Sequence, residues 1–138
     1  MKLSIFVAFS LLLPSISVHA LLSDEKLTHL TQTIVDDINY SISKQDRTGL
    51  EQYFHRSFYF HDCVANISRM DYIKFLLLEK VTNLSFTRSV KTKTGFQMWT
   101  KEPGNDINTF YQVLHVANYA TTHEIVYGEV TRESCPSN

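Results

Sequence analysis

The stretch Phe86-Thr-Arg-Ser-Val90-Lys-Thr-Lys-Thr94 decides the fold class of this chain. Its residues alternate in character and are rich in threonine and valine, which is typical of β-strands. The same texture continues through Phe96, Met98 and Trp99. The sequence therefore predicts that the chain changes to β structure from Leu84 onward.

A turn divides this β-rich half at residues 101–106, where Pro103 and Gly104 stand side by side. Residues 107–120 and 123–132 then predict two more long strands, joined near Thr121-Thr122. Strands that follow one another through short turns form an antiparallel meander.

The residues before the strands carry helical patterns. After Ser23, a predicted N-cap, apolar residues recur at spacings of three and four, which indicates a helix with one buried stripe: Leu27, Leu30, Ile34, Ile38 and Ile42. Thr48 and Glu51 form a capping box for a short second helix whose apolar face holds Leu50, Tyr53 and Phe54.

A short strand is expected at residues 58–64, followed by a third helix. Ser68 and Asp71 are placed to cap this helix, which runs from Met70 to Val81. It is apolar over most of its surface, so we expect it to be deeply buried. Helices followed by a meander predict an α+β fold, with N-terminal helices packed on an antiparallel sheet.

This order of elements resembles the nuclear transport factor 2-like superfamily, a cone-shaped, cystatin-like α+β fold. The resemblance spans residues 22–132 and implies that the sheet is strongly curved. It rests on three pieces: the first helix ending in Lys44-Gln45-Asp46, the element Leu50-Glu-Gln-Tyr-Phe54 leading into Phe58-Tyr-Phe60-His-Asp62, and the helix from Met70 to Val81.

The chain also resembles small secreted members of that superfamily from nematodes, which combine a signal peptide with few cysteines. The resemblance implies a pocket at the mouth of the cone, where enzyme members use an Asp or His base with Tyr or Asp donors. True cystatins share the layout of helix on sheet, but this chain has no Gln-x-Val-x-Gly loop. Protease inhibition is therefore disfavoured.

Residues 1–20 have the features of a secretory signal peptide. Lys2 gives a positive start, residues 5–13 form an apolar run, and Val18-His19-Ala20 offers a cleavage site. The run is too short to cross a bilayer as a retained helix. We therefore predict a secreted, extracellular domain of residues 21–138 that has no membrane attachment after cleavage.

Cys63 and Cys135 remain in the mature chain. An even count on an oxidising route favours one intramolecular disulfide. The competing interpretations are a metal pair and a catalytic thiol, but the close Cys/His spacing of a zinc site is absent.

Three Asn-x-Ser sequons, at Asn39, Asn66 and Asn83, predict glycosylation at the surface. Asn66 is the best candidate because it precedes a predicted helix start, whereas Asn39 falls within a predicted helix.

The composition is that of one folded domain: of 138 residues, 43% are apolar and 20% are charged. Basic and acidic residues number 13 and 14, for a net charge of -1, so binding to nucleic acid is not expected. The six histidines are scattered and form no metal-binding spacing. No phosphate-binding or dinucleotide-binding loop is present in the sequence, and we predict no cofactor.

The candidate site depends on the register of the last hairpin. A two-residue turn at Thr121-Thr122 pairs Ala120 with His123 and places His115 opposite Gly128. His115 would then stand beside a gap in an apolar wall, on a face that we assign to the concave side. Its expected polar companions in a pocket are Tyr111, Tyr59 and His61.

Two functions follow from these patterns. The first is a secreted binding domain that uses a pocket for a small apolar ligand, or a sheet face for a partner such as a second copy in a homodimer. The alternative is a cofactor-free isomerase, dehydratase or cyclase with His115 as base and a tyrosine as donor. The sequence assigns no catalytic residue.

Overall fold

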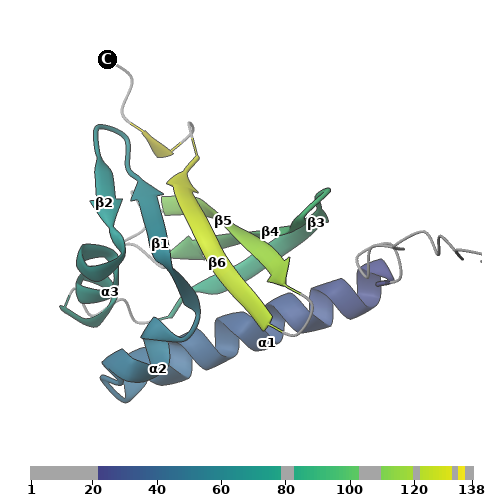
Figure 1. Cartoon of the computed structure of the whole chain (residues 1–138), viewed down its shortest axis with the longest axis horizontal. Helices are drawn as coiled ribbons and strands as arrows, with labels where there is room; N and C mark the ends of the chain where they lie inside the picture. The colour runs from purple at the N-terminus through teal and green to yellow at the C-terminus, as the bar shows by residue number, and fades with distance from the viewer. Residues whose placement is uncertain (1–21, 79–82, 103–109, 120–121, 132–133, 136–138) are drawn as a thin grey trace, which may run out of the picture.

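A computed structural model describes residues 22–78, 83–102, 110–119, 122–131 and 134–135, so the predicted signal peptide lies outside the described residues. Helices come first and strands dominate the second half (Figure 1). The elements are α1 (Asp24–Ser43), α2 (Arg47–Glu51), β1 (Phe54–His61), β2 (Asn66–Ser68), α3 (Arg69–Leu78), β3 (Ser85–Lys91), β4 (Gly95–Glu102), β5 (Phe110–Tyr119) and β6 (Thr122–Val130).

The first helix matches its sequence pattern. Ser23 caps α1, its hydroxyl accepting a hydrogen bond from the Lys26 amide at 3.3 Å. Asp24 and Glu25 lie in the first turn, where the helix dipole favours negative charge. Its predicted apolar stripe packs into the core.

The cap of the second helix differs from the prediction. Asp46 is the N-cap of α2, and its carboxylate accepts from the Gly49 amide at 2.9 Å. Thr48 lies inside the helix, so the predicted capping box is wrong. The helix begins at Arg47, so its first free amides lie within reach of the short carboxylate of Asp46 rather than of the Thr48 hydroxyl. Phe54, expected in this helix, begins β1.

The six strands form one sheet in the order β2-β1-β6-β5-β4-β3. The sheet is mixed, because β1 and β6 run parallel while the other neighbours are antiparallel. The predicted antiparallel meander is confirmed in β3 to β6, and only the pairing of β1 with β6 departs from the antiparallel sheet that we predict. Hairpins force antiparallel pairing, but β1 and β6 lie far apart in the chain and are joined by no hairpin.

Helix α1 runs along one face of the twisted sheet, and α2 and α3 lie toward its β1 and β2 end (Figure 1). Helix α3 is only half covered: Tyr72, Ile73 and Leu76 are buried, while Phe75 and Leu78 are exposed. The predicted deep burial of this helix is wrong, since it packs at an end of the sheet rather than beneath its centre.

The core fills the space between the sheet and the helices. Tyr72 of α3 stacks on Phe60 of β1, with ring centroids 4.7 Å apart. The Tyr72 hydroxyl donates to the side-chain oxygen of Gln112 on β5 at 3.0 Å, which satisfies a buried polar group. Phe96, Met98 and Leu114 complete this layer.

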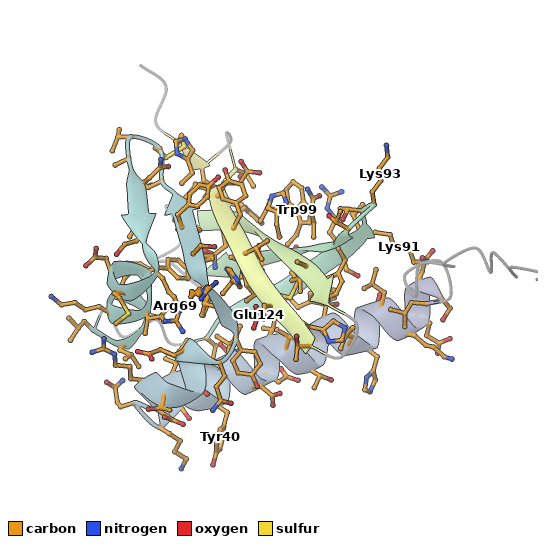
Figure 2. The ribbon with its side chains drawn as sticks, viewed as in Figure 1. Tyr40, Arg69, Lys91, Lys93, Trp99 and Glu124 are labelled. Carbon is orange, nitrogen blue, oxygen red and sulfur yellow. A yellow bond between two sulfur atoms is a disulfide. The ribbon has the colours of Figure 1, made fainter. Side chains whose placement is uncertain are left out.

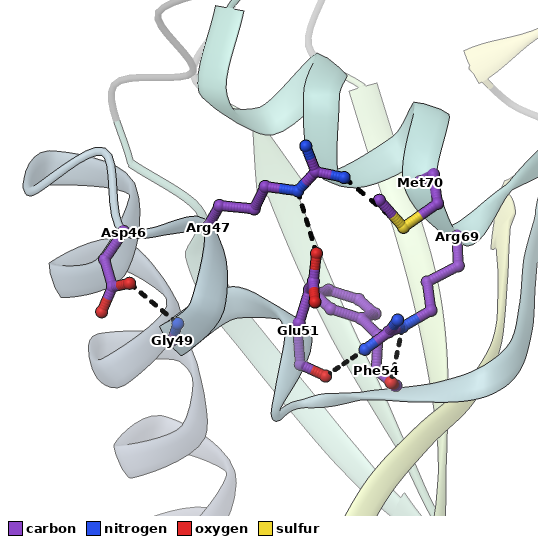
Figure 3. A network of polar contacts seen from close by, with 7 residues as sticks. All are labelled: Asp46, Arg47, Gly49, Glu51, Phe54, Arg69 and Met70. Atoms are coloured by element: carbon purple, nitrogen blue, oxygen red, sulfur yellow. Dashed lines mark hydrogen bonds and ion pairs between the residues drawn. The ribbon is translucent and has the colours of Figure 1, made fainter.

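A polar cluster joins α2 to α3 (Figure 3). Arg69, at the start of α3, donates to the backbone carbonyls of Glu51 and Phe54. Arg47 bonds the Glu51 carboxylate at 2.9 Å on the solvent side. The Arg69 guanidinium thus satisfies carbonyls at the point where α2 ends and β1 begins.

Cys63 and Cys135 form a disulfide, which confirms the predicted pairing. Its two Cα atoms are 5.5 Å apart, and the bond ties the chain end to the segment after β1. Ser134 adds a second tie, because its hydroxyl accepts from the Tyr111 amide at 2.9 Å.

Candidate functional site

The sheet has two different faces. One carries core residues and is covered by the helices. The other, which we call the open face, has no helix packed on it among the described residues. Trp99 lies on this face and points to the opposite side of the molecule from Tyr40 of α1 (Figure 2).

Strand pairing arranges the open face into two rows that cross the sheet. The Trp99 row consists of Asn66, His61, Glu129, Val113, Trp99 and Arg88, one from each strand. The His115 row consists of Tyr59, Tyr127, His115, Gln97 and Val90. Side chains two residues apart on a strand share a face, so the two rows are neighbours.

The observed register corrects the predicted one. His123 pairs with Asn118 rather than Ala120, and the pairing then shifts again between His115 and Val116. This shift places His115 opposite Tyr127. An extra residue on one strand moves every later side chain of that strand to the other face.

The gap at Gly128 consequently lies on the core face. Gly128 pairs with Leu114, and a Cβ atom at this position would meet Phe60 at 2.6 Å and Leu114 at 2.9 Å. Large neighbours fill the space above the glycine. His115 therefore lies on the face away from the helices, not on the concave side to which we assigned it.

A chain of hydrogen bonds fixes His115. Its Nε2 lies 3.2 Å from Oε1 of Glu129, and its Nδ1 lies 3.4 Å from the side-chain nitrogen of Gln97. Because an amide nitrogen donates, Nδ1 accepts and Nε2 carries the proton. Both ring nitrogens thus face protein groups, and neither is directed at open space as a general base requires.

Glu129 is the centre of this chain. Its second oxygen, Oε2, accepts from the Tyr127 hydroxyl at 3.0 Å. Burial raises the pKa of Tyr127 to about 12, and the hydrogen bond to Glu129 and the charge of that carboxylate add to the rise. The Tyr127 ring also contacts His115 and Tyr59, with centroids 4.9 and 4.8 Å away.

The Trp99 row contains a stacked cation. The Arg88 guanidinium lies over the Trp99 indole, 4.1 Å from the ring centroid, an arrangement attractive through cation–π interaction. No carboxylate pairs with Arg88 within the part of the chain that the structure describes. Val113 lies beneath these side chains and is 4% exposed. It does not belong to the core between the sheet and the helices, so the side chains of the open face cover it.

A hollow of about 390 Å³ opens on this face. Arg88 and Trp99 line one side, Glu129 the other, and Val113 lies between them. Gln97, Val130 and Thr131 complete the lining. The hollow therefore combines an apolar floor with fixed groups of opposite charge.

Three solved structures share the arrangement of the elements. An NTF2-like (nuclear transport factor 2-like) protein of unknown function from Silicibacter pomeroyi aligns with a TM-score of 0.63 at 12% identity, over 80% of this chain and 98% of that one. An NTF2-like protein from Cytophaga hutchinsonii gives 0.58 at 11%, with the same coverage. A protein of unknown function with a cystatin-like fold from Nostoc punctiforme gives 0.57 at 7%, over 79% and 92%.

The chain has the nuclear transport factor 2-like fold. No family model matches the sequence, and no curated protein matches it. The fold that the resemblance implies is confirmed, while membership of the superfamily and the likeness to nematode members stay predictions.

The other predicted pocket residues of this domain lie on the open face. Tyr59 is in the His115 row, and His61 is in the Trp99 row, where its Nδ1 donates to Asn66 at 2.9 Å. Tyr111 lies at the far end, held by Ser134 and outside the lining of the hollow. Their role in binding a ligand stays a prediction.

Sequence reasoning missed Glu129 and Tyr127, the partners of His115. Tyr127 and Glu129 are two positions apart, a spacing that puts both side chains on one face of a strand. Only the observed register places them next to His115. No cluster of three or more metal-ligating side chains occurs in the described segments. Within those segments no helix has the length and apolar character that a membrane span needs.

Proposed function

We propose that this nuclear transport factor 2-like domain is a secreted binding domain whose recognition surface is the open face. The observation that carries the proposal is the pair of residue rows across the sheet. They present tyrosine, tryptophan and arginine together, the residue types that dominate the binding energy of protein interfaces.

A partner protein is a better occupant than a small apolar ligand. The space between sheet and helices holds buried side chains such as Phe60, Tyr72 and Leu114. The hollow on the open face is lined by charged and polar groups as well as apolar ones. A wide, mixed surface of this kind suits a protein partner.

A second copy of the chain is the first candidate partner. Arg88 and Glu129 lie at separate positions of one row and carry opposite charges. A two-fold axis through the centre of the open face would bring each group near its opposite in the other copy. The disulfide and the absence of a spanning helix among the described residues are compatible with secretion.

Site-specific photo-cross-linking tests the proposal. A photoreactive benzoylphenylalanine replaces Val90, which is 42% exposed on the open face, or Tyr40, which is 65% exposed on α1. We expect cross-linked adducts from secreting cells at position 90 and none at position 40. An adduct with the same chain identifies a homodimer, and an adduct with another protein identifies a different partner. Equal labelling at both positions, or none, would contradict the proposal.

The alternative, a cofactor-free isomerase, dehydratase or cyclase, gains no support from the described residues. His115 is its candidate base, and both ring nitrogens of His115 face Gln97 and Glu129. A substrate would have to displace one of these bonds before the imidazole accepts a proton.

A further inference from the structure

The three sequons lie in very different surroundings. An N-linked glycan is attached to the Nδ2 atom of asparagine, so that atom must reach solvent in the folded protein. The structure describes all three positions: Asn39 is half-buried in α1, Asn66 is exposed on β2, and Asn83 is exposed just before β3.

Asn39 has a structural role that excludes a glycan. Its Nδ2 donates to the Leu84 carbonyl at 2.9 Å, and its Oδ1 accepts from the Leu84 amide at 2.8 Å. These two bonds join α1 to the chain that enters β3. The serine of the sequon, Ser41, is only 6% exposed. A sugar on Nδ2 would displace the backbone of Leu84.

Asn66 is free to carry a glycan. Its Oδ1 accepts from His61, so the amide nitrogen lies on the other side of the planar amide group. Among the described residues that nitrogen has no hydrogen-bond partner. Ser68, the serine of this sequon, is also exposed.

Asn66 is also the end residue of the Trp99 row. Asn66 pairs with His61, and His61 pairs with Glu129. Adjacent strands are about 4.8 Å apart, so Asn66 is roughly 10 Å from Glu129 across the sheet. A glycan of several sugars at Asn66 therefore stands at the β2 edge of the open face, close to Tyr59.

We propose that Asn66 is glycosylated in the mature protein, that Asn39 is not, and that the glycan at Asn66 limits access to the open face from the β2 side. The inference rests on the secretion that the proposed function includes. In the transfer, Nδ2 bonds to C1 of the sugar while the bond from C1 to the pyrophosphate of a lipid-linked oligosaccharide breaks. The lipid pyrophosphate leaves with the electron pair of that bond, and the proton released from Nδ2 balances its charge.

Site mapping tests the first part. The full chain is expressed in animal cells that perform N-glycosylation, collected from the medium, treated with peptide N-glycosidase and mapped by mass spectrometry. We expect the deamidation mark at position 66 and none at position 39. Asn66→Gln should remove one glycan, Ser68→Thr should keep it, and Ser41→Ala should leave the glycan mass unchanged. An unmodified Asn66, or a modified Asn39, would overturn the proposal.

Enzymatic iodination tests the second part, because the enzyme needs room around each tyrosine. Tyr59 is 46% exposed beside the glycan, and Tyr40 is 65% exposed on α1. Removing the glycan should raise iodination of Tyr59 several-fold and leave Tyr40 unchanged. Unchanged iodination of Tyr59 would show that the glycan does not restrict the face. Neither experiment requires a partner, so a failure of partner binding leaves these results interpretable.

Discussion

Gly128 of β6 lies directly against the ring of Phe60 of β1, so close that a Cβ atom on the glycine would be 2.6 Å from Cδ2 of the ring. The parallel pairing of β1 with β6 makes these two residues partners. The contact holds together two strands that are distant in sequence and closes the core at the middle of the sheet.

Gly128→Ala should destabilise the fold, because the added methyl group overpacks the core at a cost of about 1–3 kcal/mol. Chemical denaturation measures the loss. Thr122→Ala, at an exposed position of the same strand, is the matched control. Leu114→Ala removes the second close neighbour, so the double variant should lose less than the sum of the two single variants. Simple additivity would show that Leu114 does not oppose the added methyl group, and an unchanged stability of Gly128→Ala would show that position 128 tolerates a side chain.

The disulfide should contribute about 4 kcal/mol to stability by the chain-entropy model for a closed loop of this size. Its two cysteines are 72 positions apart. Replacing Cys63 and Cys135 by serine should lower the free energy of unfolding by about this amount. Reductant should lower the stability of the parent protein similarly and leave that of the double variant unchanged. An effect of reductant on the double variant would contradict this assignment.

Arg69→Ala should cost about 1–3 kcal/mol, because the backbone carbonyls of Glu51 and Phe54 then lose their partially buried donor. The neighbouring Arg47 is the control. Its side chain is 60% exposed, and its ion pair with Glu51 is worth at most about 1 kcal/mol. Thermal melts of both variants compare the two arginines. Equal losses would show that the carbonyl contacts of Arg69 do not matter.

Tyr127 should ionise near pH 12, since its pKa is about 12 in the folded protein, against an ordinary value of 10.0. The folded state therefore holds this proton more tightly than the unfolded chain does. Its contribution to stability is complete below pH 10 and is lost as the pH rises to 12. Tyr53, beside Asp37, shows the same shift for the same main reason, burial.

Absorbance titration of tyrosinate, with Tyr127→Phe as the reference, isolates this group. Glu129→Gln should lower the pKa of Tyr127 because it removes the carboxylate charge. An unchanged titration in Glu129→Gln would indicate that burial alone sets the pKa.

Some features of the candidate site were predictable and others were not. The alternation around His115 predicted a strand with that residue on one face, and this is what β5 shows. The identity of its neighbours was not predictable, because His123 pairs with Asn118 and the register then shifts between His115 and Val116, and together these place Tyr127 rather than Gly128 opposite His115. Nothing in the local sequence marks that shift, since it depends on how β6 fits beside β1.

The sequence by itself determined the local features: helices before a strand-rich half, the Ser23 cap of α1, and the pairing of two cysteines that have no other partner. The helix cap and the periodic patterns depend on residues a few positions apart. The disulfide needs no such pattern, because two cysteines can pair in only one way. The tertiary structure decided the parallel contact of β1 with β6, the register of β5 on β6, and hence which face carries His115, Trp99 and Glu129. These features depend on packing between distant segments. Side chains on a strand alternate between the two faces of the sheet, so one extra residue moves every later side chain of that strand to the opposite face.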